Sequence, residues 1–423
     1  MKLGTRRLDY KWVIIAVCFL IEFVVLGFCS GTRGLFLAAV TDALDLKRSL
    51  FSVDDSLRFI TQSIIYLFFG NLLRRYGAKK MIAVGTLSLC VSLLIYSRAT
   101  QILSFYVGGV LFGAGMALTT STMVTTIIRR WCSGPNVGKI LGVVLGANGV
   151  GAAVATQMLT PLIYEEGNVF GYRNAYLLLI PFALFTGILA LLFIKDAPGQ
   201  DGAAMAPHKK KARGNSWPGI TYEQAKRTPY FYTALLCVLL TGMMLHGMGN
   251  VSSAHMLDVG LTPETVAAVA SIGSLLLTGA KFITGASYDR FGLRVTAFVS
   301  HMLAVLAMVL LANVGASSLG VGVAFVCKVC SSLALPLETI MLSLIANDLF
   351  GSVSFDKVLG IISAFNTAGY ALGSPLSNAF YDVLGTYVPV FYIFAVAMVL
   401  VAVLFQWSAV QAQKVRQTVQ NAQ

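Results

Sequence analysis

The stretch GNLLRRYGAKK, at residues 70–80, returns later in the chain as GASYDRFGLRV, at residues 285–295. Both copies follow a long apolar run, and they carry glycine, aromatic and basic residues at matching positions, 215 residues apart. A second pair, KILGVVLGAN at 139–148 and KVLGIISAFN at 357–366, repeats at an offset of 218 residues. Two matches at nearly one offset indicate that the second half of the chain repeats the first.

The whole chain of 423 residues is apolar. Hydrophobic residues make up 57% and charged residues 12%, and the mean hydropathy is +0.77. A soluble domain carries about 25% charged residues, so the composition indicates an all-α polytopic membrane protein. Apolar runs of about 20 residues predict twelve transmembrane helices. They lie near 11–40, 50–73, 78–97, 102–128, 137–163, 172–195, 229–256, 262–287, 294–314, 317–347, 356–382 and 387–407.

A polar segment at 196–228, rich in Gly, Ala, Pro and Lys, divides these helices into six and six. It is expected to be a flexible cytoplasmic linker between an N-terminal bundle at 1–195 and a C-terminal bundle with its tail at 229–423. The run at 12–40 is too long for a cleaved signal and is expected to be a retained first helix. Two parallel six-helix repeats are typical of a transporter whose site lies between them, near the membrane midplane.

The formal net charge is +13, and its placement argues against a nucleic-acid partner. Lys and Arg gather in alternate short loops and in the two tails, for example Arg74, Arg75, Lys79, Lys80 and the run at 209–211. The opposite loops hold few basic residues. By the positive-inside rule, both termini are predicted to be cytoplasmic, with the chain in the plasma (cytoplasmic) membrane.

The repeated stretch resembles the signature of the major facilitator superfamily, Gly-x-x-x-(Asp)-Arg-(Phe/Tyr)-Gly-x-(Lys/Arg). The matching positions are Gly70, Arg75 and Gly77 in the first copy and Gly285, Asp289, Arg290 and Gly292 in the second. This resemblance covers essentially the whole chain and implies two pseudo-symmetric six-helix bundles. Arg74 stands where the family usually places aspartate. That aspartate helps lock the cytoplasmic side in the family, so its loss in one copy predicts an asymmetric inner gate.

Within that superfamily, the stretches at 129–154, 278–292 and 347–377 resemble the monocarboxylate transporters and the oxalate/formate exchangers. In those families an arginine thought to hold the substrate carboxylate stands at the position of Lys281. A lysine keeps the charge but lacks the bidentate fork of arginine. Asn366 stands where the oxalate exchangers place a second cation. This argues against a dianion held between two cations and favours a monocarboxylate, or a dianion held with help from Arg58.

Ionisable residues inside the spans are candidates for function because each is costly there unless paired or hydrated. Lys281 either binds the substrate anion or extends along its helix to the cytoplasmic interface. Arg58, roughly 13 Å from the outer end of its helix, either faces the cavity or pairs with Glu22, Asp54 or Asp55. Lys328, roughly 18 Å from the nearer helix end, needs a cavity, a carboxylate or backbone carbonyls around it.

Glu22 and Glu338 are candidates for proton coupling or for static ion pairs, because a substrate that competes for a neighbouring cation would link their protonation to transport. His246 is a candidate for binding substrate or shuttling protons, with a satisfied core histidine as the alternative.

Three further residues complete the candidate set. Asn148 and Tyr66 are the repeat counterparts of Asn366 and Lys281. Arg33 lies near the outer end of the first helix, either at the interface or on the substrate's path.

The sequence therefore predicts a secondary active transporter of a small organic anion, with a monocarboxylate and proton symport as first choices and anion exchange as the second. A transporter of amino acids or amphipathic drugs, and a non-transporting receptor on the same fold, are the alternatives. The chain has no nucleotide-binding loop, HExxH or GxSxG, so an enzyme is not predicted. No cofactor or metal is expected, and Cys327 and Cys330 are assigned to packing. The expected partners are the substrate, protons and the lipid bilayer, and the resemblance implies a monomer.

Overall fold

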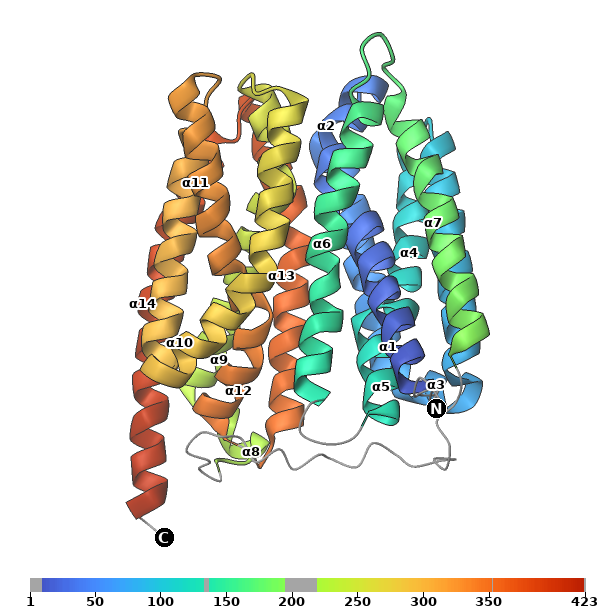
Figure 1. Ribbon diagram of the computed structural model, residues 1–423. Coiled ribbons are helices and arrows are strands. Elements are labelled where there is room, and N and C mark those ends of the chain that lie inside the picture. Colours follow the sequence, from blue (N-terminus) through green and yellow to red (C-terminus); the bar gives the residue numbers. More distant parts are fainter. Residues whose placement is uncertain (1–9, 133–136, 195–218, 352, 422–423) are drawn as a thin grey trace, which may run out of the picture. The chain divides into compact units, whose positions relative to one another are not determined.

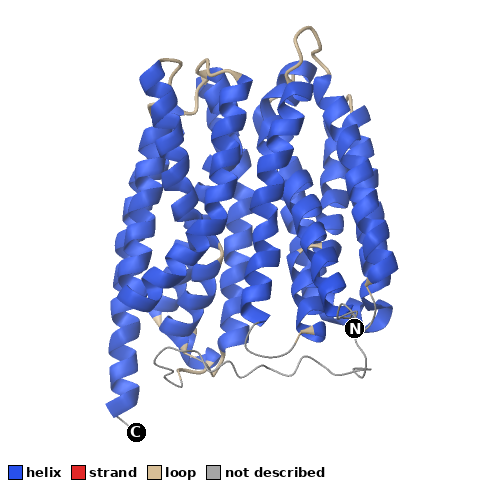
Figure 2. Cartoon of the chain, viewed as in Figure 1, coloured by secondary structure: helices blue, strands red, loops and turns tan. Residues whose placement is uncertain are grey.

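A computed structural model describes residues 10–132, 137–194, 219–351 and 353–421, and within them every regular element is a helix (Figures 1 and 2). The expectation of an all-α protein is confirmed. The elements are α1 (Tyr10–Ile21), the π-helix η1 (Glu22–Ser30), α2 (Arg33–Leu44), α3 (Arg48–Arg98), α4 (Ile102–Thr119), α5 (Ser121–Trp131), α6 (Val137–Ile163), α7 (Gly171–Phe193), α8 (Tyr222–Ala225), α9 (Pro229–Asp258), α10 (Pro263–Ala312), α11 (Ser318–Ala334), the 3-10 helix η2 (Leu335–Glu338), α12 (Ile340–Phe350), α13 (Phe355–Leu384) and α14 (Val388–Asn421).

The repeated sequence signature forms a turn between two membrane helices. Nine helical segments of the described chain are long and apolar enough to cross a membrane. Two of them, α3 with 51 residues and α10 with 50, are too long for one crossing, and each breaks at the last glycine of the signature. Gly77 has φ 74° and Gly292 has φ 75°, a conformation that glycine adopts at low cost. Each of these helices therefore supplies two predicted spans. With α13 over the eleventh span, the helices are consistent with the predicted twelve.

Two spans that the sequence predicts as continuous are interrupted. The fourth, predicted at 102–128, breaks at Thr120 between α4 and α5, and the tenth, predicted at 317–347, passes through η2 and Thr339 (Figure 1). In the tenth, Pro336 removes a backbone donor and crowds the preceding turn. In the fourth, the Thr119 and Thr120 hydroxyls donate to the carbonyls four residues earlier, both at 2.7 Å, a contact that bends helices.

The end of the last helix is also corrected, since α14 continues to Asn421 and not to the predicted 407. Its last turns are polar, so the hydropathy pattern that ends the span does not end the helix.

The chain forms two compact units. Unit 1 comprises residues 1–33 and 61–206, and unit 2 comprises residues 34–60 and 207–423. Unit 2 therefore includes α2 and the beginning of α3 together with the C-terminal half of the chain. Of the predicted linker at 196–228, the described part is 219–228 with α8, and the lysines at 209–211 lie outside the described residues. The expected division into 1–195, 196–228 and 229–423 stays a prediction.

Glycines let helix backbones touch at equivalent places in each unit. In unit 1, a Cβ on Gly151 of α6 would lie 2.0 Å from the carbonyl oxygen of Phe23 in η1. In unit 2, a Cβ on Gly369 of α13, the repeat counterpart of Gly151, would lie 2.3 Å from the carbonyl oxygen of Leu239 in α9. No side chain fits at either contact, so these glycines permit the close helix approach common in membranes.

Candidate functional site

A buried polar cluster in unit 2 joins the beginning of α3 to α9. Arg58 Nη2 lies 2.6 Å from Asp55 Oδ1, and the other carboxylate oxygen, Oδ2, lies 3.0 Å from His246 Nε2 and 2.7 Å from Asn250 Nδ2. Asp55 and Arg58 are 6% and 5% exposed. Removing two charges from water is costly, and the close ion pair, together with the hydrogen bonds to Asp55 Oδ2, offsets much of that cost. These four residues are called the Asp55 cluster below.

Aromatic rings enclose one side of the Asp55 cluster. The His246 ring stacks on Tyr370 of α13, with ring centres 4.7 Å apart, and meets the edge of Phe59 at 4.8 Å. The guanidinium carbon of Arg58 lies 4.2 Å from the centre of the Phe59 ring. The Tyr370 hydroxyl donates to the backbone carbonyl of Glu338, at 3.3 Å. A chain of contacts therefore leads from Arg58 and His246 to the interruption in the tenth span.

Two predicted site residues of unit 2 keep an unused polar atom. Glu338 is 7% exposed and Asn366 is 3% exposed, and neither Glu338 Oε1 nor Asn366 Nδ2 has a hydrogen-bond partner among the described residues. A buried polar atom without a partner costs about 1–3 kcal/mol. Such atoms are expected where water, a proton or a ligand supplies the missing contact.

The two candidate lysines lie half-buried on neighbouring helices of unit 2, Lys281 on α10 and Lys328 on α11. The stem of Lys328 crosses α10 at Gly273, where a Cβ would come within 2.3 Å of Lys328 Cε. Within the described chain, the Lys328 ammonium makes no ion pair with a carboxylate. No carboxylate of the described chain therefore compensates the charge of Lys328.

The candidate residues of unit 1 lie around η1 and the interruption in the fourth span. Glu22 is fully buried at the first position of η1, and the Ser121 hydroxyl, at the start of α5, donates to Glu22 Oε2 at 3.3 Å. A helix N-terminus favours a neighbouring negative charge. Tyr66 accepts a hydrogen bond from Gln62 Nε2 at 2.8 Å. Asn148, on α6, presents its backbone carbonyl at the contact with Gly27 of η1.

Arg33 lies against aromatic side chains of unit 1. Its guanidinium carbon is 4.8 Å from the centre of the Phe112 ring and 5.5 Å from that of Tyr96, and Nη1 donates to the Tyr96 hydroxyl at 3.4 Å. Aromatic faces attract a guanidinium and keep it near the protein.

The basic residues of the two signature copies make local contacts. Arg74 donates to Asn71 Oδ1 at 2.5 Å, and the guanidinium groups of Arg75 and Arg290 lie over the rings of the residues that follow them. Asp289 is exposed and has no ion pair with a described residue. The space around Gly70 and Gly285 is open, with no atom within 4 Å of a built Cβ.

A second polar network, which the sequence did not predict, surrounds Arg48 at the start of α3. Arg48 binds both carboxylate oxygens of Asp258, at 2.5 and 2.9 Å, and lies 4.1 Å from the centre of the Tyr381 ring and 3.3 Å from the Tyr387 hydroxyl. Asp382 accepts hydrogen bonds from the backbone N–H groups of Arg48 and Ser49. No sequence signal pointed to this network, because its members come from three distant segments of the chain.

The cysteines agree with a packing role. All seven are buried and free of disulfides, and the Cys327 thiol donates to the carbonyl of Ala307 at 3.2 Å. Residues 10–132, 137–194, 219–351 and 353–421 contain no group of three or more His, Cys, Asp or Glu side chains arranged to hold a metal.

Comparison with known proteins places the chain among transporters. The model of the Major Facilitator Superfamily matches residues 18–354. The chain is 26% identical over 159 residues to the uncharacterized MFS-type transporter YcxA of Bacillus subtilis (strain 168), which covers 37% of this chain and 38% of the relative. It is 24% identical over 225 residues to Multidrug resistance protein 2 of the same organism, 51% of this chain and 52% of the relative. It is 23% identical over 176 residues to Monocarboxylate transporter 3 of Mus musculus, 40% of this chain and 33% of the relative.

The chain thus matches about half or less of the length of these curated relatives. Over the full fold, it is similar to the crystal structure of the nucleoside transporter NupG, with a TM-score of 0.73 and 15% identity, over 95% of this chain and 99% of that one. At 15% identity the likeness shows the shared fold alone. A shared fold does not identify the substrate, which has to be argued from the residues of the site.

Proposed function

Because the chain belongs to the Major Facilitator Superfamily, we propose that it is a secondary active transporter of a small organic anion, with a monocarboxylate as the first candidate. The observation that carries this proposal is Asp55, a carboxylate shared between the cation Arg58 and the titratable ring of His246. An incoming carboxylate is chemically equivalent to Asp55 and can take its place on Arg58.

Protonation of His246 gives Asp55 a second cationic partner, so that Arg58 becomes available to the substrate. Histidine changes charge near physiological pH, and one proton together with one monoanion leaves the net charge of the Asp55 cluster unchanged. This change of ion-pair partners supports proton symport. Anion exchange is the alternative. Glu22 and Glu338, the carboxyl groups beside the two interrupted spans, are the further proton-coupling candidates.

The remaining candidates complete the substrate site in this proposal. Lys281 and Lys328 supply positive charge, and Asn366 offers an amide donor that has no partner within the described chain. Asn148, Tyr66 and Arg33, all in unit 1, are the further substrate-binding candidates of this proposal. Substrate-binding groups in both repeats of the sequence would couple occupancy to alternating access.

The proposed setting is the plasma (cytoplasmic) membrane, with both termini in the cytoplasm and a single chain as the working unit. The surplus of basic residues in alternate loops supports this orientation.

The test is uptake of radiolabelled lactate, pyruvate, formate and oxalate into proteoliposomes, with and without an inward proton gradient. Wild type is compared with Lys281→Ala and with Lys47→Ala, a matched control at an exposed lysine outside the candidate site. The proposal expects uptake of a monocarboxylate that Lys281→Ala loses and Lys47→Ala keeps. Failure of the correctly folded wild type to take up any of the four anions would overturn the monocarboxylate assignment.

A transporter of amphipathic drugs is the second candidate, and the similarity to Multidrug resistance protein 2 favours it. It predicts that neutralising Lys281 spares transport. A receptor on the same fold would bind a ligand in these proteoliposomes without ever taking it up.

A further inference from the structure

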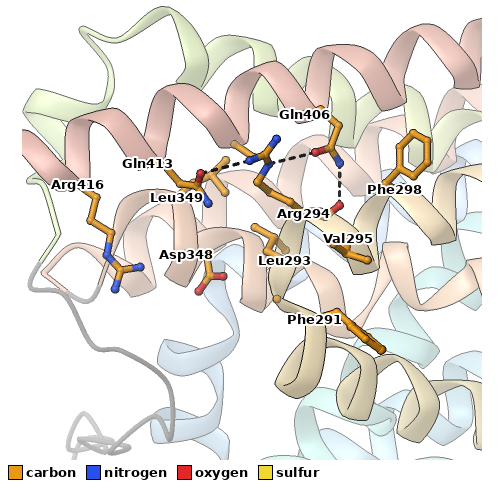
Figure 3. A pocket seen from close by; sticks show the side chains of 12 residues that line it. Phe291, Leu293, Arg294, Val295, Phe298, Asp348, Leu349, Gln406, Gln413 and Arg416 are labelled. Carbon is orange, nitrogen blue, oxygen red and sulfur yellow. Dashed lines mark hydrogen bonds between the residues drawn. The ribbon is translucent and has the colours of Figure 1, made fainter.

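A cavity of about 710 Å³ opens in unit 2, away from the Asp55 cluster (Figure 3). Its walls come from the Gly292 turn and the part of α10 that follows it, from the end of α12 and from the second half of α14. The volume lies within the range of about 300–1,000 Å³ that is usual for small-molecule sites. No residue of the proposed transport site lines it apart from Gly292 of the signature.

Arg294 brings a positive charge into this cavity. Its guanidinium donates to two neutral amide oxygens, Oε1 of Gln406 at 3.4 Å and Oε1 of Gln413 at 3.5 Å (Figure 3). Both hydrogen bonds are long, and Arg294 makes no ion pair with any residue of the described ranges. The charge is therefore held in place without being neutralised. A phosphate or carboxylate would gain shorter, charge-assisted hydrogen bonds than the two amides provide.

The cavity also holds a carboxylate, which is engaged elsewhere. Asp348 Oδ1 accepts a hydrogen bond from the Tyr288 hydroxyl at 2.7 Å. Arg416 lines the same part of the cavity (Figure 3), and its charge attracts the Asp348 carboxylate. The Asp348 carboxylate thus has a hydrogen-bond donor in Tyr288 and a nearby cation in Arg416. Arg294 instead lies beside Gln406 and Gln413 of α14.

The wall beside Arg294 is apolar and exposed. Phe291, Val295 and Phe298 are 55%, 49% and 45% exposed. Both α10 and α14 contain segments long and apolar enough to cross a membrane, and Val295 and Phe298 belong to the span predicted at 294–314, so lipid chains are the expected neighbours of this wall. A cation next to an exposed apolar wall suits a ligand with an anionic head and a hydrocarbon chain.

We infer that this cavity binds the headgroup of an anionic phospholipid, with the phosphodiester on Arg294 and an acyl chain along Val295 and Phe298. A guanidinium matches the geometry of phosphate oxygens with two parallel donors. Basic pockets between transmembrane helices are known places for anionic headgroups. This inference is independent of the transported substrate, because the cavity lies apart from the Asp55 cluster.

The test uses the purified full-length protein in detergent, titrated with phosphatidylglycerol or with the zwitterionic phosphatidylcholine. Binding is read from the thermal unfolding midpoint and by native mass spectrometry. Phosphatidylglycerol is expected to raise the midpoint and to give a bound adduct, and Arg294→Gln is expected to weaken this binding about fivefold, the effect of one interfacial cation. The matched control is Arg290→Gln, which removes an exposed arginine four residues earlier, before the Gly292 turn and outside the cavity.

Each of the other outcomes would overturn the inference. An equal response to the two lipids would remove the role of the headgroup charge. An equal loss in Arg290→Gln would assign the effect to diffuse surface charge. Stabilisation by inorganic phosphate as strong as that by phosphatidylglycerol would assign the site to a soluble anion. If Arg294→Gln does not fold, Arg294→Lys replaces it. Lysine keeps the positive charge but lacks the two parallel donors of the guanidinium, so this variant is expected to bind phosphatidylglycerol more weakly than wild type.

Discussion

Two arginines of α3, Arg48 and Arg58, are equally buried, and each pairs with an aspartate, yet their surroundings differ. Arg48 binds both oxygens of Asp258, on another helix, and lies against the rings of Tyr381 and Tyr387. Arg58 pairs with Asp55, three residues earlier on its own helix, and that carboxylate is shared with His246.

The two ion pairs differ in whether the carboxylate has a second partner. Both carboxylate oxygens of Asp258 are taken up by one guanidinium, so Arg48 fastens the start of α3 to the end of α9. Asp55 has a second partner, the ring of His246, so its carboxylate is shared and does not bind Arg58 alone. We therefore assign Arg48 to stability and propose Arg58 for transport.

The largest effect is expected from Arg48→Ala. Removing one partner of a buried bidentate pair leaves Asp258 without its cation and should cost about 3 kcal/mol of folding stability. The measurement is thermal unfolding in detergent. Arg98→Ala, at the exposed end of α3 beyond the Gly77 turn, is the control and should change stability by about 0.5 kcal/mol or less. Equal midpoints for the two variants would contradict the structural role of Arg48.

The next effect is expected in transport and not in folding. Arg58→Gln removes a charged hydrogen-bond donor from the proposed site and should lower anion uptake about tenfold to a hundredfold. Its unfolding midpoint should fall less than that of Arg48→Ala. Uptake at the wild-type rate with the same substrate would remove Arg58 from the binding site.

A more selective effect is expected from His246→Gln. Glutamine can still donate to Asp55 but takes up no proton, so the acceleration of uptake by an inward proton gradient should disappear. Exchange of labelled for unlabelled substrate, with no gradient, should continue. A gradient response as large as that of wild type would exclude His246 as the proton carrier, and loss of both uptake and exchange would indicate a general defect of the site.

The smallest effect is expected from Asp382→Ala. This carboxylate accepts the backbone N–H groups of Arg48 and Ser49 at the start of α3. Losing a cap of this kind costs about 1 kcal/mol, so the unfolding midpoint should fall by less than in Arg48→Ala. Asp42→Ala is a suitable control, because this exposed aspartate lies 3.7 Å from Arg48 Nη2 without capping the helix. A larger loss in Asp382→Ala than in Arg48→Ala would reverse the order proposed for this network.

The fold could be predicted to a large extent from the sequence. Hydrophobic runs placed the helices, and the repeated glycines placed the turns at Gly77 and Gly292, because both depend on a few neighbouring residues. The interruptions at Thr120 and Thr339 were missed, since an apolar run looks the same whether or not its helix is continuous. Pro336 was the available signal for the second of them.

The candidate site could be predicted only as a set of residues. Glu22, Asp54 and Asp55 were the three partners predicted for Arg58. The structure shows the ion pair with Asp55. Asn250 and Tyr370 were missed, because an amide and a phenol inside an apolar span resemble ordinary packing residues until their neighbours are known.

The class of protein, the duplication and the course of the helices follow from the amino-acid sequence, because hydrophobicity, repeats and the positions of glycine and proline can be read along the chain. The pairings, such as Arg48 with Asp258, 210 residues apart, follow only from the packing of the helices. Each residue along a helix turns the side chain by about 100°, so a small error in a helix boundary sends a charge to a different neighbour. Contacts between distant helices depend on the rotation of each helix about its axis, and that rotation is determined by how the helices pack.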